Sequence, residues 1–103
     1  MYKFVFFVPE SHLDAVKSAV FAAGAGRIGN YDCCAWQVRG EGQFRPLHGS
    51  DPYLGDTDKL TLVIEYRVEM VCADECIQQA LAALRAAHPY EEPAYDIWRL
   101  CDF

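Results

Sequence analysis

Hydrophobic and polar residues alternate over residues 60–70, and this is the clearest pattern in the chain. Leucine, isoleucine, tyrosine, valine and methionine occupy every second position, while mostly polar or charged residues stand between them. A period of two predicts a β-strand with one packed face and one largely polar face. At about 3.4 Å per residue, this strand would span more than about 30 Å, which is long for a small domain.

Three other segments are expected to form strands, at residues 2–8, 31–39 and 94–100, because aromatic and β-branched residues dominate them. Residues 11–23 and 74–87 carry apolar side chains at spacings of three and four, which predicts two amphipathic helices. The intervening residues 40–58 are rich in glycine and proline and are expected to form a long loop.

The predicted order is therefore β-α-β-β-α-β. Such an order favours an α+β, ferredoxin-like βαββαβ sandwich, in which a four-stranded antiparallel sheet carries two helices on one face. A chain of 103 residues has room for one domain with one core, so we expect residues 1–103 to form a single domain.

Composition excludes several functional classes. The formal net charge is −6 and the nine basic residues are scattered, so we expect no nucleic-acid binding. No apolar run approaches the ~20 residues that span a bilayer, and residues 1–8 lack the features of a signal peptide. We therefore expect no membrane partner and a cytoplasmic location. The five cysteines include no C-x-x-C pair, which favours free thiols over a disulfide framework or a zinc site.

Gly24, Gly26 and Gly29 spell the G-x-G-x-x-G pattern of dinucleotide-binding proteins. That pattern binds a pyrophosphate only when a strand precedes it and a helix follows it. Here the predicted helix precedes it and a strand follows. The glycines are better explained as a left-handed helix cap and a tight turn.

Histidines near carboxylates are the candidates for chemistry. His48 lies in the Gly/Pro-rich segment near Asp51, and His88 ends the second predicted helix just before Glu91 and Glu92. Such groups suit a divalent metal ion or proton transfer. A histidine in the last turn of a helix is also a favourable structural cap, so both roles stay open for His88.

Other residues add less. His12 is expected to be solvated, and four large aromatic residues suit either the core or an oligomer interface: Trp36, Phe44, Tyr53 and Trp98. The chain contains no Ser-His-Asp set, P-loop or metalloprotease helix, so no complete reaction can be assembled from these residues.

Residues 87–93, AHPYEEP, resemble the HPYE-x-P signature that enters the last core strand of CutA proteins. Four more segments accompany it: AGAGRIGNYDCCAW (23–36), GEGQFRP (40–46), GSDPYLGD (49–56) and EYRVE (65–69). Together, over residues 3–100, they resemble the small domain inserted in many bacterial members of the Nif-three-like (NGG-one interacting factor) family. In that family the domain also exists as a stand-alone protein of about this length.

The resemblance implies a fold related to CutA and the PII signalling proteins. Those relatives are typically trimers whose sheets pack around a central axis and whose long hairpin reaches across a neighbour. CutA proteins are associated with tolerance of divalent metals, and PII proteins bind nucleotides and small effectors. The two-metal core of the Nif-three-like family is absent from this sequence, as is the lysine-rich phosphate cradle of PII, so neither activity is implied.

We therefore expect a non-enzymatic homo-oligomer, trimeric by analogy, that acts as a binding or regulatory module for a divalent metal ion or a small effector. The candidate binding residues are Tyr31, Cys33, His48, His88, Glu91 and Glu92, with His48 and His88 as the metal ligands. Apart from such a metal ion, no cofactor is expected.

Two alternatives remain. One is an enzyme related to metal-dependent hydrolases that combines His48, His88 and a carboxylate in an intersubunit cleft. The other is a protein-interaction or scaffold domain in which the polar motif only shapes a tight turn.

Overall fold

The computed structural model describes residues 1–103 and has the predicted order of elements, with a short 3₁₀ turn leading into each helix. The strands and helices are β1 (Tyr2–Pro9), α1 (Leu13–Ala22), β2 (Trp36–Phe44), β3 (Thr61–Cys72), α2 (Ile77–Ala87) and β4 (Tyr95–Arg99). Neither helix is long and apolar enough to cross a membrane.

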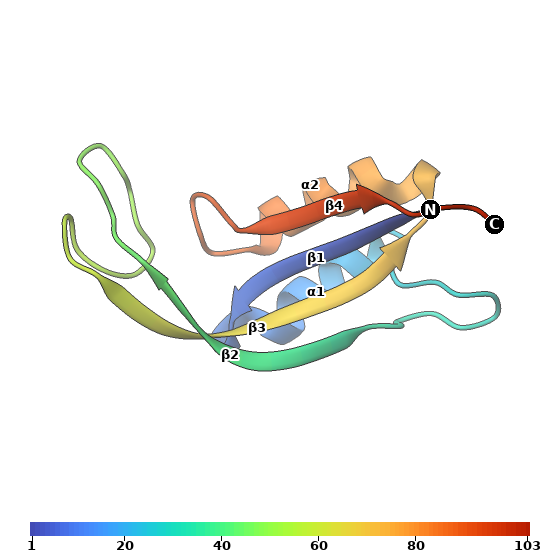
Figure 1. Cartoon of the computed structure of the whole chain (residues 1–103), viewed down its shortest axis with the longest axis horizontal. Coiled ribbons are helices and arrows are strands. Elements are labelled where there is room, and N and C mark those ends of the chain that lie inside the picture. The colour runs from blue at the N-terminus through green and yellow to red at the C-terminus, as the bar shows by residue number, and fades with distance from the viewer.

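The four strands form one antiparallel sheet in the order β2-β3-β1-β4. Both helices cover the same face of this sheet, behind it in Figure 1, and the other face is left open. The predicted α+β, ferredoxin-like class is confirmed.

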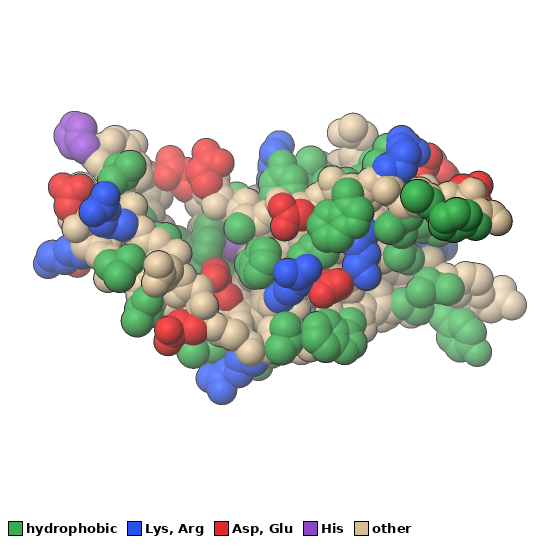
Figure 2. All heavy atoms as spheres, viewed as in Figure 1, with side chains coloured by type: hydrophobic (Ala, Val, Ile, Leu, Met, Phe, Trp, Pro, Cys, Tyr) green, Lys and Arg blue, Asp and Glu red, His purple; other side chains and the backbone are tan.

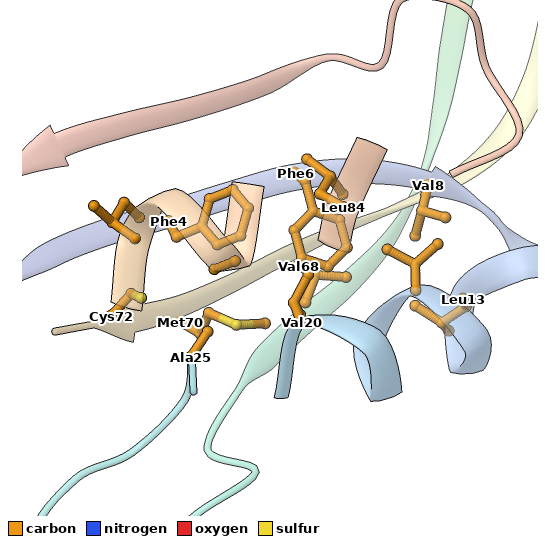
Figure 3. Close-up of a cluster of buried hydrophobic side chains, with 13 residues drawn as sticks. Phe4, Phe6, Val8, Leu13, Val20, Ala25, Val68, Met70, Cys72 and Leu84 are labelled. Atoms are coloured by element: carbon orange, nitrogen blue, oxygen red, sulfur yellow. The ribbon is translucent and has the colours of Figure 1, made fainter. Parts of the chain in front are cut away.

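The core lies between the sheet and the two helices. From the sheet it takes Phe4 and Phe6 of β1, and from α2 it takes Leu84; all three are fully buried (Figure 3). Burying a side chain of this size contributes about 1.5–3 kcal/mol. The strand period places Phe4 and Phe6 on one face of β1, which explains why this short segment anchors the core.

Strand β3 extends well beyond this core. Val68 and Met70 are buried under the helices, but Leu62 and Ile64, on the same face, are 56% and 39% exposed. The first half of β3 pairs with the end of β2, and together with the loop of residues 45–60 they form an arm that projects at the left of Figure 1. The predicted packed face is therefore confirmed only for the second half of the strand.

The second strand differs from its predicted range of 31–39. It begins at Trp36 and continues to Phe44, because residues that were expected to form a loop pair with β3. Tyr31 makes only an isolated bridge with Ile28. The glycine interpretation is confirmed, since Gly24 ends α1 with φ +106° and Gly29 has φ +57° in the turn that follows.

Candidate functional site

A cavity of about 420 Å³ lies at the base of the arm, between the loop of residues 45–60 and the segment of residues 88–94. Figure 2 shows the surface hollowed between the arm and the rest of the domain, with acidic side chains at the rim. The lining combines apolar and aromatic groups with a few charged ones: Phe44, Pro46, Leu47, Pro52, Tyr53, Leu54, Tyr90 and Ala94, with Arg45, Glu65, Glu91 and Glu92.

Two kinds of contact hold the walls of the cavity together. The Asp51 backbone N–H donates a hydrogen bond of 3.0 Å to the Glu91 carboxylate. The ring of Tyr90 packs between Tyr53 and Phe44, with centroids 6.2 and 6.1 Å apart. Glu91 therefore positions the 45–60 loop and also lines the cavity.

His88 is a structural connector. Its side chain is buried, and Nε2–H donates to the Phe7 carbonyl oxygen at 2.7 Å while Nδ1 accepts from the Tyr90 N–H at 3.1 Å. These two bonds define a neutral imidazole protonated on Nε2. Because both ring nitrogens are occupied, the geometry does not support His88 as a metal ligand. Its ring also bonds a carbonyl of β1, rather than the last carbonyls of its own helix.

Burial of His88 gives the protein a pH dependence. Burial lowers the pKa of its imidazole below the usual range, so the unfolded chain binds this proton more readily. The stability from neutral His88 is present above the unfolded pKa of about 6.5 and is lost as the pH falls from there to the lowered folded value. Within that interval each pH unit costs up to about 1.4 kcal/mol.

Urea unfolding at pH 7.5 and 5.5 checks this expectation. The wild type should lose more stability on acidification than His88→Gln. Burial raises the pKa of Glu65, which acts in the opposite direction, but it does so in both proteins and cancels in the comparison. An equal pH dependence in the two proteins would contradict the assignment.

Glu65 and Tyr90 form the polar floor of the cavity. The Tyr90 hydroxyl is buried beside the Glu65 carboxylate without a hydrogen bond of normal geometry. Burial raises the pKa of Glu65, and burial together with the charge of Glu65 raises the pKa of Tyr90 to about 12. The pair is thus a half-buried carboxylate that no cation of the chain neutralises and a buried hydroxyl beside it.

Gly42 makes room for this carboxylate. A Cβ at position 42 would collide with Oε1 of Glu65, whereas one at Gly40, two residues earlier in β2, would meet nothing within 4 Å. Glycine in a strand often marks such a close approach.

Gly42→Ala should therefore push the Glu65 carboxylate into solvent, since its flexible end can move, and return the pKa of Glu65 toward the ordinary value. Gly40→Ala should leave that pKa unchanged. Carboxyl ¹³C titration by NMR measures both variants, and a Glu65 pKa that is the same in both would show that Gly42 does not set its position.

The structure divides the predicted binding residues between two ends of the molecule. Tyr31 and Cys33 lie in the exposed hairpin beside the chain termini, at the right of Figure 1. His48 is exposed in the loop at the other end and does not line the cavity, as His88 does not. Only Glu91 and Glu92 line it. No group of three or more His, Cys, Asp or Glu side chains is arranged to hold a metal ion.

Sequence reasoning missed the residues that shape the cavity. Glu65, Tyr90 and Phe44 were not among the candidate binding residues. Outside the lining, His12, which was expected to be solvated, contacts the Tyr53 ring edge-on with centroids 5.6 Å apart. The signal for Tyr90 was its place inside the HPYEEP segment. All five cysteines are free, as predicted.

The chain has close relatives among curated proteins, although no protein-family model matches it. A GTP cyclohydrolase 1 type 2 homolog of Mycobacterium tuberculosis is 49% identical over 98 residues, 95% of this chain and 26% of that protein. The homolog of Halalkalibacterium halodurans is 41% identical over 102 residues, 99% of this chain and 27% of that protein. The chain thus spans about a quarter of the length of these relatives.

Solved structures agree with this result. A Bacillus cereus protein related to NIF3 matches 98% of this chain with 26% of its own, at 38% identity and a TM-score of 0.83. The PII-like protein CutA from Nostoc matches 97% of this chain and 81% of its own, at 13% identity and a TM-score of 0.68, which shows the shared fold. The resemblance expected from the sequence segments is confirmed.

Proposed function

We propose that this chain, a CutA/PII-like domain of the kind found in NIF3-related proteins, is a non-catalytic module that binds a small ligand between the 45–60 loop and the 88–94 segment. The observation that carries the proposal is the cavity of about 420 Å³, with aromatic walls and a few convergent polar groups. Concave, mostly apolar sites of this size with sparse polar groups are typical of small-molecule binding.

The arrangement of the histidines argues against the hydrolase alternative that combines His48, His88 and a carboxylate. Such a site needs its histidine base within hydrogen-bond reach of the reacting group. His88 spends both ring nitrogens on backbone groups, and neither His48 nor His88 lines the cavity. A divalent-ion site between subunits would need donors from more than one chain, and calorimetry with divalent ions tests that variant.

Exposed apolar groups on the open face of the sheet support a homo-oligomer. Trp36 of β2 is 61% exposed, and Val38 and Trp98 are exposed on the same face. Exposed clusters of this kind mark interaction surfaces. The proposed state is a trimer, and light scattering should give three times the chain mass of 11.6 kDa. A strict monomer at high concentration would contradict it.

A cavity-filling variant tests the ligand proposal. Ala94 lines the cavity and is exposed, so Ala94→Phe should fill part of it without disturbing the core. In a thermal-shift screen with small molecules, ligands that stabilise the wild type should lose their effect on Ala94→Phe.

Ala86→Phe is the matched control. Ala86 is an exposed position of α2 outside the cavity, so the same ligands should stabilise this variant as they do the wild type. Equal stabilisation of Ala94→Phe would place the site elsewhere.

A further inference from the structure

The charges in the cavity are unbalanced. Its lining holds three carboxylates, Glu65, Glu91 and Glu92, against one cation, Arg45. None of these four groups forms an ion pair, because the salt bridges of the chain involve other carboxylates. An anionic ligand would add repulsion to this site, whereas a cationic one would relieve it.

The aromatic residues provide a second, independent reason to expect a cationic ligand. Phe44, Tyr90 and Tyr53 follow one another along the cavity wall, with successive ring centroids about 6 Å apart. Ring faces attract an ammonium or guanidinium group within about 6 Å, and they attract it more strongly when water is excluded. A wall of this kind also packs against the apolar body of a ligand.

The floor of the cavity provides acceptors. The Glu65 carboxylate is half-buried, and the Tyr90 hydroxyl beside it is buried without a hydrogen bond of normal geometry, although it lies near enough to lower the pKa of that carboxyl. Buried polar atoms without partners are uncommon and call for an explanation. A ligand N–H could donate to the Glu65 carboxylate and to the oxygen of Tyr90, which would satisfy both groups at once.

We propose that the ligand of this cavity is an organic cation: an ammonium group on an apolar or aromatic body, with the ammonium bound by Glu65 and Tyr90 and the body packed against Phe44 and Tyr53. This inference rests on the proposed function, because it assigns the ligand class of the same cavity. A bare metal ion does not fit, since no three donors converge there, and a phosphate group does not fit the carboxylates.

Three probes that differ mainly in charge test the assignment: 2-phenylethylamine, 2-phenylethanol and phenylacetate, titrated into the full chain by calorimetry at pH 7.5. The amine should bind at least about tenfold more tightly than the alcohol. Phenylacetate should bind most weakly.

Glu65→Gln should lower the affinity for the amine about tenfold, because the substitution removes the charge while keeping the shape of the side chain. The affinity for the alcohol should stay unchanged. Glu41 is an exposed residue of β2 outside the cavity. Glu41→Gln removes the same charge and should change neither the affinity for the amine nor that for the alcohol. The wild-type comparison of amine with alcohol stands even if a variant fails to fold.

The outcomes separate the two proposals. If the alcohol or the acid binds as tightly as the amine and Ala94→Phe blocks that binding, the cavity is a ligand site but the cation assignment is wrong. The assignment is also wrong if Glu65→Gln leaves amine binding unchanged. If none of the three probes binds, the cation assignment is contradicted; the proposed function is contradicted as well if no compound in the thermal-shift screen stabilises the wild type.

Discussion

Replacing His88 with alanine is expected to lower the free energy of unfolding by about 3 kcal/mol. The side chain is 6% exposed and bonds both the Phe7 carbonyl and the Tyr90 N–H. Its loss removes packing and leaves two backbone groups without these partners, and each such orphaned group costs about 1–3 kcal/mol. A loss of this size is a large fraction of the 5–15 kcal/mol typical of a domain. Urea unfolding measures it.

The hydrogen bonds of His88 also explain why replacing this residue should affect the cavity. The Phe7 N–H donates to the carbonyl of Ala94, the residue just before β4 begins, and the Phe7 carbonyl accepts from His88. His88 therefore holds the 88–94 segment, with Tyr90, against the edge of β1. His88→Ala should therefore lower the affinity of the cavity for any ligand that it binds.

His48→Ala is the control for this prediction. His48 is exposed in the 45–60 loop, and surface substitutions usually change stability by less than about 0.5 kcal/mol. His88→Gln keeps a donor for the Phe7 carbonyl, so its free energy of unfolding should lie between those of His88→Ala and His48→Ala. Equal stability of His88→Ala and His48→Ala would refute the connector role.

Gly26→Ala is expected to lower the free energy of unfolding by about 2–3 kcal/mol. Gly26 has φ +79°, a left-handed conformation that costs an L-residue about 1–2 kcal/mol. An added Cβ would also lie 2.8 Å from a ring carbon of Phe21 and 3.0 Å from the Cys34 carbonyl oxygen. The segment cannot easily yield, because Gly26 donates to Val71 and accepts from Cys34.

Gly29→Ala separates the cost of a positive φ from the cost of the close contacts. Gly29 also has a positive φ, +57°, but an added Cβ there would meet nothing within 4 Å. It should therefore cost only the conformational part, about 1 kcal/mol. Denaturant unfolding of the two variants should show Gly26→Ala as the less stable by at least about 1 kcal/mol. Equal losses would mean that the contacts with Phe21 and Cys34 do not constrain this turn.

Local patterns predicted the strand β3 well and the strand β2 poorly. The alternation over residues 60–70 is a property of neighbouring residues, so it located β3 to within two residues at the end near the core. Gly40 and Gly42 weaken strand propensity, and only their pairing with Glu65 and Val63 makes them part of β2. Pairing of this kind depends on residues distant in sequence, which a local pattern does not contain.

The same limit applies to the site. His88 fitted a helix cap, but its partner Phe7 lies 81 residues away. Tyr31 and Cys33 were conspicuous in the sequence, yet the fold places them at the end of the molecule opposite the cavity. Glu65 was one charge among several in an alternating strand, and only the space above Gly42 distinguishes it.

The central claim is that this domain binds a small ligand in the cavity between the 45–60 loop and the 88–94 segment. Mapping amide chemical shifts of the ¹⁵N-labelled chain during titration with small-molecule mixtures of differing charge tests it most directly. The account predicts that the largest changes fall on Asp51, whose N–H bonds the cavity residue Glu91, and on Tyr90, which lines the cavity itself. Changes centred on the hairpin of Tyr31 and Cys33, with Asp51 and Tyr90 unmoved, would contradict it.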